Sequence, residues 1–292
     1  MKRGKSRRLF KKKKSHSNQR LGCIIAIIVL IPICYGLYLY YQQYSVQHSS
    51  KPQIETSVSL PTPSGKDLEI PISLIPRQEQ IIRHKGYTFS YNKDLKIPNW
   101  VSYELTRQET KGKEKRGDNF IADPLVKGAI ATNADYARSG YDKGHMAPAA
   151  DMKWSPDVMK ESFYFSNMCP QHPQLNRRGW KNLEEKIRDW AVADSAIIII
   201  CGPIIDKPSK TIGKNKVAVP ERFFKVILSP FVKPARGIGF LFNNRQAVEP
   251  LSTYAVSIDS IEKLTHMDFF SPLPDEIENA VEANADYYQW PR

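Results

Sequence analysis

Residues 140–152 read GYDKGHMAPAADM, and this short stretch contains the histidine from which the fold and function can be argued. His145 directly follows Gly144. It lies two residues after a base, Lys143, and three residues after an acid, Asp142. Gly144 is expected to let the backbone turn tightly and to expose the imidazole. Because histidine exchanges a proton near neutral pH, His145 is a candidate general base. A histidine that only forms local hydrogen bonds is the alternative.

A second stretch, SNMCPQHPQLNRRGWKNLEEK at residues 166–186, adds oxygen donors. Asn176 stands just before an expected helix, and Glu184 follows eight residues later, about 80° further around that helix. The carboxamide and the carboxylate should therefore point roughly the same way. Such donors suit a hard cation such as Mg²⁺, which keeps most of its water. The alternative is an N-cap at Asn176 and a solvated Glu184.

Together the two stretches resemble the DNA/RNA non-specific endonuclease family of ββα-metal (His-Me finger) nucleases, which includes mitochondrial enzymes. The family pattern Asp-Arg-Gly-His, then Pro-Ala and Asp, is matched at residues 142–145, 148–149 and 151, with Lys143 in place of Arg. Its downstream pattern Ser-Asn, Pro-Gln, Leu-Asn, Trp and Leu-Glu is matched at residues 166–167, 170–171, 175–176, 180 and 183–184. The resemblance covers about residues 80–285.

This resemblance implies an α+β fold with a central, mostly antiparallel sheet flanked by helices, in which a β-hairpin and a helix grip one metal ion. It also implies a Mg²⁺-dependent endonuclease, with Mn²⁺ as a substitute, that hydrolyses DNA and RNA to 5′-phosphate ends. In that scheme His145 deprotonates the attacking water, Asn176 is the direct metal ligand, and Glu184 holds the metal's water shell.

The remaining roles also follow from the resemblance. Arg116 would clamp a phosphate oxygen, and Lys143 would contact the substrate without the bidentate geometry of an arginine. Asn167 would orient local groups, and Asp142 would brace the His145 loop. Arg178 stands where the family commonly has glycine, so the start of the helix is expected to be shifted. A solvated charge run is the alternative for Arg116.

Hydrophobic patterning predicts the main elements of the domain. Strands are expected at residues 196–201 (AIIIIC), 223–228, 239–242 and 254–258, and the first of them should be covered on both faces. One helix should begin at Ser155-Pro156, and a second should carry the apolar spacing of residues 180–191.

Charge is concentrated at the N-terminus of the chain. The 292 residues carry a net charge of +13, but residues 1–20 hold ten Lys and Arg and no acid, which leaves 33 Lys and Arg against 30 Asp and Glu elsewhere. Bulk charge therefore does not argue for nucleic-acid binding. The 41% of hydrophobic residues and the four cysteines exclude a disordered chain and a small disulfide scaffold.

Residues 21–41 contain no charge and would span roughly 30 Å as a helix, the thickness of a bilayer core. We expect residues 1–20 to be a basic cytoplasmic tail, 21–41 a transmembrane anchor, 42–68 a flexible linker and 69–292 the nuclease domain. That domain would lie outside the cytoplasm, in a bacterial periplasm or on the cell surface, or alternatively at the mitochondrial inner membrane. A cleaved signal peptide and a buried core helix are the other interpretations of residues 21–41.

Several alternatives stay open at this point. Cys169 and His172 have a spacing that zinc ligands use, but no second pair matches them. Cys169 and Cys201 would be either a disulfide or two buried thiols. Two alternatives to an endonuclease are a surface nucleic-acid-binding module and a metal-dependent phosphodiesterase for smaller esters. Because the family includes dimers, a homodimer is an expected state, and any inhibitor protein is unidentified.

Overall fold

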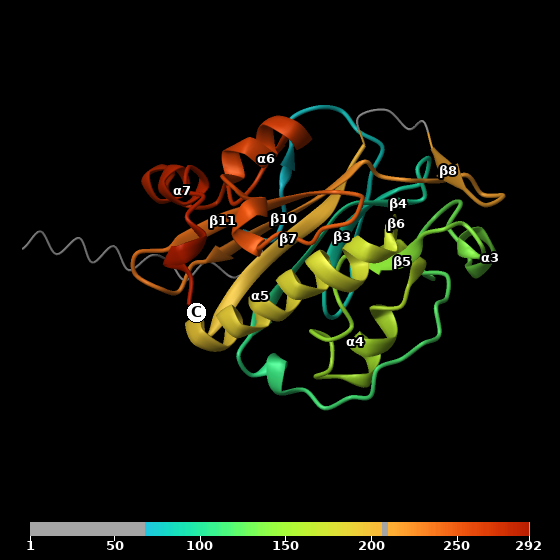
Figure 1. Ribbon diagram of the computed structural model, residues 1–292, viewed down its shortest axis with the longest axis horizontal. Coiled ribbons are helices and arrows are strands. Elements are labelled where there is room, and N and C mark those ends of the chain that lie inside the picture. The colour runs from blue at the N-terminus through green and yellow to red at the C-terminus, as the bar shows by residue number, and fades with distance from the viewer. Residues whose placement is uncertain (1–67, 206–209, 292) are drawn as a thin grey trace, which may run out of the picture. The chain divides into compact units, whose positions relative to one another are not determined.

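The computed structural model describes residues 68–205 and 210–291 (Figure 1). The tail and the anchor expected at residues 1–20 and 21–41, and the linker up to residue 67, lie outside these described residues. Within the described ranges, no helix has both the length and the apolar composition needed to cross a membrane.

A seven-stranded sheet with the order β12-β11-β10-β7-β4-β3-β2 forms the centre of the domain, and every neighbouring pair is antiparallel. The prediction of an α+β fold with a mostly antiparallel sheet is confirmed. The strands are β2 (Gln80–Arg83), β3 (Thr88–Asn92), β4 (Ile97–Thr106), β7 (Ala196–Ile204), β10 (Arg222–Ser229), β11 (Arg236–Asn243) and β12 (Ala255–Val256).

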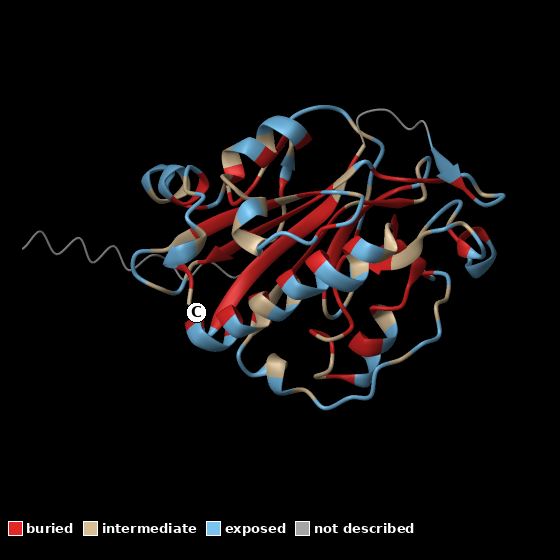
Figure 2. Ribbon diagram, in the orientation of Figure 1, coloured by how far each residue is buried: buried red, intermediate tan, exposed pale blue. Residues whose placement is uncertain are grey.

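Alternating side chains of β7 enter two different cores, because successive residues of a strand point to opposite faces of the sheet. Ile197 and Ile199 belong to the larger core, whereas Ile198 and Ile200 belong to a second core on the other face. All four side chains are fully buried, and Figure 2 shows the central strands as the most continuous buried part of the molecule. The prediction of a strand covered on both faces is therefore confirmed.

Helices cover both faces of this sheet (Figure 1). Helix α5 (Lys181–Asp194) packs Leu183, Ile187 and Trp190 into the larger core, at the helical spacing expected from the sequence. Helices α6 (Ile258–Thr265) and α7 (Asp275–Glu282) pack into the second core through residues such as Ile261 and Val281. The sheet therefore separates α5 from α6 and α7.

The remaining short elements surround this framework. They are β1 (Ile72–Ser73) paired with β13 (Met267–Asp268), β5 (Asp142–His145) paired with β6 (Met168–Gln171), β8 (Thr211–Ile212) paired with β9 (Val217–Ala218), helices α3 (Asn133–Tyr136) and α4 (Pro156–Glu161), a π-helical turn η3 (Leu175–Trp180), and the 3₁₀ turns η1 (Glu109–Lys111), η2 (Phe165–Asn167), η4 (Leu251–Tyr254) and η5 (Tyr287–Gln289).

The helix predicted at Ser155-Pro156 is present as α4, but the strand predicted at residues 254–258 is mostly wrong. Only Ala255–Val256 pairs with β11, and α6 begins at Ile258. The Ser257 hydroxyl accepts a hydrogen bond from the backbone N–H of Ser260 at 3.2 Å, which caps α6 and ends the strand. This cap outweighed the hydrophobic pattern on which the prediction was based.

Candidate active site

One cavity of about 500 Å³ brings together five of the seven predicted site residues. It is lined by strand β5, the π-helical turn η3, helix α5 and the segments around residues 116–120 and 148–150. A larger cavity of about 660 Å³ beside Lys85 and Trp154 contains none of the seven. The five that meet are Arg116, Lys143, His145, Asn176 and Glu184.

The unit that builds this cavity is a strand pair followed by a helix. β5 pairs with β6 antiparallel, with His145 opposite Met168, and the chain then continues through η3 into α5. The Trp180 indole N–H donates to the backbone oxygen of His145 at 3.1 Å. The start of α5 is therefore tied to the strand that carries the histidine.

His145 is buried at the wall of the cavity, with 8% of its surface exposed. Its ring lies against the rings of Phe120 and Phe163, at centroid distances of 5.7 and 5.1 Å. The buried Nε2 atom has no hydrogen-bond partner in the described part of the chain. The alternative of a histidine saturated by local hydrogen bonds therefore does not fit this atom.

The expectation that Gly144 forms a tight turn and exposes His145 is wrong. Gly144 lies within strand β5, and a Cβ atom at this position would collide with the side chain of Gln171. Glycine is needed here because the two strands and the buried glutamine approach closely. His145 reaches the cavity from a strand, not from an exposed loop.

The surroundings of His145 favour its neutral form. Burial, together with the positive charges of Arg116 and Lys143, lowers the pKa of the imidazole to about 3. A histidine with such a pKa is unprotonated at pH 7 and has a free electron pair. It can therefore accept a proton, which is what a general base requires.

Asn176 is held by Asp142 rather than by a helix cap. The Asn176 amide Nδ2 donates to Asp142 Oδ2 at 3.0 Å, and Arg177 donates to both oxygens of the same carboxylate at 2.8 Å. Although partial burial raises the pKa of Asp142, these hydrogen bonds outweigh it and hold the pKa below its usual value. The amide nitrogen is thereby engaged, and the Asn176 oxygen is the atom available to a ligand.

Asn176 stands before α5, as predicted, and lies within the π-helical turn η3 that leads into that helix. Asp142 does not line the cavity, and its contacts are with Asn176 and Arg177 and not with the segment after His145. The structure therefore gives Asp142 the task of orienting the amide.

Glu184 projects from α5 into the same cavity and is half-buried. Burial raises the pKa of its carboxyl to about 7; Lys225 and Arg188 oppose this shift, and the nearby Asp151 adds to it. A carboxyl group in this state gains from a nearby cation. The alternative of a fully solvated Glu184 is excluded by this burial.

The donor chemistry of the cavity fits a hard divalent cation. Asn176 and Glu184 both line the cavity, and the oxygen donors that their side chains carry are those that Mg²⁺ prefers. Among the described residues, no group of three His, Cys, Asp or Glu ligand atoms converges at this cavity. An ion held here would therefore keep most of its water, which is usual for Mg²⁺ and unusual for zinc.

Two cations stand beside the histidine. The Arg116 guanidinium lies 5.3 Å from the centre of the Phe163 ring, and Lys143 Nζ lies 4.2 Å from the centre of the Phe120 ring. Lys143 Nζ also donates to the Asn133 side chain at 2.9 Å. The two rings that flank His145 thus also position two positive charges, which is an arrangement suited to a phosphate group.

The sequence matches the family model described as DNA/RNA non-specific endonuclease over residues 64–276, most of the chain. The chain belongs to the DNA/RNA non-specific endonuclease family. It is accordingly a nuclease, and the resemblance stated from the sequence is confirmed.

Relatives and a solved structure agree with this assignment to the DNA/RNA non-specific endonucleases. A nuclease of Nostoc sp. is 30% identical over 250 residues, which cover 80% of this chain and 88% of the relative. Human mitochondrial endonuclease G is 33% identical over 213 residues, 67% of this chain and 71% of that protein. The crystal structure of an EndoG/EndoGI complex, which concerns EndoG inhibition, matches with a TM-score of 0.63 and 29% identity over 68% of this chain and 89% of that one.

Asn167, predicted to be part of the catalytic group, is buried outside the cavity of this nuclease. Its Nδ2 donates to the backbone oxygens of Ala147 and Ser162, and its Oδ1 accepts from the Ala147 N–H, all at 2.9 Å. It therefore fixes the backbone just after His145. Asn167 is a positioning residue, which agrees with the local orienting role expected and not with a catalytic one.

Sequence analysis did not find four charged residues that line the cavity, Arg177, Lys181, Glu185 and Arg188, or the buried Lys225, whose charge acts on Glu184. Lys225 is fully buried in β10, with Nζ 4.4 Å from the centre of the Trp180 ring and 3.5 Å from the Met146 oxygen that accepts its hydrogen bond. The signal was a single lysine inside the apolar run FFKVIL. Strand alternation would have placed it on the face that α5 covers.

The cysteine alternatives are resolved within the described residues. Cys169 and Cys201 are both free and both buried, so the interpretation as two thiols is correct. Cys169 belongs to no metal-binding cluster with His172. The zinc interpretation therefore has no support in this nuclease.

Proposed function

We propose that this chain is a Mg²⁺-dependent, sugar-non-specific endonuclease that cleaves DNA and RNA to 5′-phosphate ends, with Mn²⁺ as a substitute metal. The observation that carries the proposal is the meeting of an unpartnered, neutral His145 with Asn176 and Glu184 in one cavity. The chain's place in a family of metal-dependent nucleases supports the same function.

In the proposed reaction, the His145 imidazole accepts a proton from a water molecule. The resulting hydroxide oxygen attacks the phosphorus atom, and the bond between phosphorus and the 3′ oxygen breaks. The phosphate therefore stays on the 5′ oxygen, as a 5′-phosphate end. The lowered pKa of His145 supports this role because the imidazole is unprotonated before the step. Phe120 and Phe163 restrict the ring to one side of the cavity.

Asn176 and Glu184 are the residues that would hold the metal ion, the first directly and the second through its water shell. A divalent cation at this place supplies positive charge that offsets the charge developing on the phosphate and the leaving oxygen. Asp142 supports the direct ligand by engaging the amide nitrogen, so that the oxygen is presented.

Arg116 and Lys143 are proposed to contact the phosphate. Both are at the cavity and neither belongs to a helix in the described ranges, so they suit contacts with the backbone of a nucleic acid and not with base edges. Such contacts carry no sequence information. They are therefore consistent with a nuclease that accepts DNA and RNA alike.

The direct test uses the full-length protein with plasmid DNA and with a structured RNA as separate substrates. We expect both to be degraded with Mg²⁺, no cleavage with EDTA, and recovery when Mg²⁺ is restored. Asn176→Ala should raise the Mg²⁺ concentration needed for half-maximal rate at least tenfold, because a direct ligand is lost. Cleavage that continues in EDTA would refute the metal requirement.

We also propose that residues 21–41 anchor the protein in a membrane, with the tail of residues 1–20 in the cytoplasm and the nuclease domain on the other side. The support is the uncharged run of 21 residues after ten basic ones. A bacterial periplasm or cell surface is the proposed location. The mitochondrial names of several relatives support the inner membrane as the alternative. A homodimer remains a proposal based on the family resemblance alone.

A further inference from the structure

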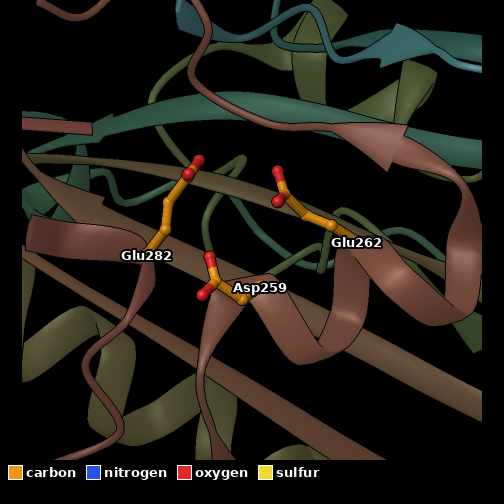
Figure 3. Close-up of side chains that lie close together, drawn as sticks. All are labelled: Asp259, Glu262 and Glu282. Carbon is orange, nitrogen blue, oxygen red and sulfur yellow. The ribbon is translucent and has the colours of Figure 1, made fainter. Parts of the chain in front are cut away.

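Five carboxylates gather on the face of the sheet opposite the nuclease cavity. They come from α6, from β13 and from α7, and they form two overlapping groups that share Glu282. Within each group, one ligand atom from each residue lies within 4.8 Å of the others. Figure 3 shows the carboxylates of Asp259, Glu262 and Glu282 gathered around one space between the two helices. The second group consists of Asp268, Glu278 and Glu282.

Glu282 distinguishes this cluster from an ordinary acidic surface. Only 7% of its surface is exposed, and its Oε1 atom is buried without a hydrogen-bond partner. Within the described residues, none of the five acids forms an ion pair with Lys or Arg. A buried carboxylate without any partner is strongly unfavourable, so the cluster lacks its counter-charge.

We propose that the group formed by Asp259, Glu262 and Glu282 is a calcium site, in which these three carboxylates bind one Ca²⁺ ion that joins α6 to α7. Ca²⁺ accepts six to eight oxygen ligands in a flexible geometry, whereas Mg²⁺ keeps several waters and takes few protein ligands. Three carboxylates, each able to bind through both of its oxygens, match the first pattern. The proposal does not depend on the nuclease mechanism, because the seven-stranded sheet separates the two sites.

The ion has a structural task in this position. Helix α7 ends at Glu282, so a cation bound by Asp259, Glu262 and Glu282 joins α6 to α7, and both helices pack into the second core. Binding to the folded state alone raises the unfolding temperature as the free ion exceeds its dissociation constant. Calcium is therefore expected to stabilise the domain without entering the reaction.

The test measures thermal unfolding of the full-length protein in detergent, in EDTA and then in excess CaCl₂, on an Asn176→Ala background that weakens metal binding at the nuclease cavity. We expect calcium to raise the unfolding temperature by about 5–10 °C at a hundredfold excess over the dissociation constant. Adding Glu282→Gln should abolish this rise. Glu276→Gln, which removes an equal charge from an exposed position of the same helix, should leave it intact.

Equilibrium dialysis with ⁴⁵Ca²⁺ gives the second measurement on the same proteins. One tightly bound ion per chain is expected in the Asn176→Ala protein and in its Glu276→Gln derivative, and none in its Glu282→Gln derivative. Mg²⁺-dependent nuclease activity of Glu282→Gln in the otherwise unchanged protein shows that this variant folds, and Asp259→Asn replaces it if it does not. The proposal is overturned if calcium gives no rise, or if the rise and the bound ion survive Glu282→Gln.

Discussion

The imidazole of His145 is kept neutral by its neighbours, and this is the property on which its chemistry depends. Two phenyl rings remove water from the ring, and two cations disfavour a third positive charge beside them. The same two cations are placed to attract a phosphate. One set of contacts would therefore serve both the proposed base and the proposed phosphate contacts.

The pH dependence of cleavage follows from this environment. Because the pKa of His145 is lowered from 6.5 towards 3, the base stays active in mildly acidic solution. At saturating Mg²⁺, the acid limb of the single-turnover rate should have its midpoint below pH 6.5. Lys143→Gln should move this midpoint upward, because it removes a positive charge from beside the imidazole. A midpoint above 6.5 in the parent protein, or a downward movement in the variant, would contradict the electrostatic explanation.

Gly144 allows a direct test of the packing beneath the histidine. Gly144→Ala places a methyl group against the Gln171 side chain, and overpacking of this kind costs about 1–3 kcal/mol. For a domain of this size, each kcal/mol lowers the unfolding temperature by about 2–4 °C. Calorimetry should show that decrease, together with weaker cleavage.

The matched control for Gly144 is Gly140→Asn. Gly140 has a φ of +82° and open space around the position of a Cβ atom, and asparagine tolerates the left-handed region. This variant should unfold within about 1 °C of the parent. An equal loss in both variants would show that the close contact with Gln171 is not the cause.

Sequence analysis identified His145, Asn176 and Glu184 correctly as neighbours, because each stands in a motif of specific residues at a specific spacing. It did not find the burial of His145 or the role of Lys225. Both depend on contacts between segments far apart in the chain, such as Phe120 and Phe163 against the histidine ring. A spacing pattern along the chain does not contain those contacts.

The π-helical turn η3 carries Asn176, the proposed metal ligand. A π-helix winds more loosely than an α-helix, so the rotation of 100° per residue used for the prediction does not apply between Leu175 and Trp180. Asn176 and Glu184 nevertheless line one cavity. The rotation of 100° per residue therefore predicted correctly that the two side chains lie close together, although part of the segment between them is π-helical and not α-helical.

Deleting Arg178 tests this element. Loss of one residue should convert the loose turn to α-helical winding and rotate Asn176 by about 100° relative to α5. The Mg²⁺ concentration for half-maximal cleavage should then rise at least tenfold, which is the rise also expected for Asn176→Ala. Arg178→Ala, which keeps the winding, should change that concentration less than twofold. Equal behaviour of the deletion and the substitution would argue against a role for the π-helical turn.

The strands of the sheet were predictable where burial on both faces left an uninterrupted apolar run, as in β7. The predicted strand at residues 254–258 failed because a serine cap starts α6 there. The order of the seven strands had no signal in the sequence. The neighbours β4 and β7 come from segments about 90–100 residues apart, as in Thr106 opposite Ala196 and Val101 opposite Cys201, and local patterns do not specify such a pairing.

The whole molecule is organised around a sheet with two different faces. The larger core and α5 carry the nuclease cavity, and the second core carries α6, α7 and the acidic cluster. This separation keeps a strongly negative group away from the cavity that receives a polyanion. The central sheet thus separates the nuclease cavity with its positively charged side chains from the negatively charged acidic cluster.

The proposed anchor leads to a prediction for the intact protein. Full-length protein should sediment with membranes, stay there after washing with high salt or carbonate, and be released by detergent, because an uncharged helix of 21 residues is held by the bilayer interior. A variant lacking residues 1–44 should appear in the soluble fraction with its nuclease activity intact. Full-length protein that carbonate removes would contradict a spanning segment.

The central claim is that His145 acts as the general base beside a metal held by Asn176 and Glu184. The most direct measurement compares the parent and His145→Ala proteins in single-turnover cleavage of plasmid DNA at saturating Mg²⁺, with DNA affinity measured separately in Ca²⁺. Removal of a general base slows a reaction about 10²–10⁴-fold. We predict a loss in that range with DNA affinity within about twofold of the parent, and no comparable loss for the exposed His266→Asn control. Cleavage by His145→Ala at the parental rate would contradict the assignment.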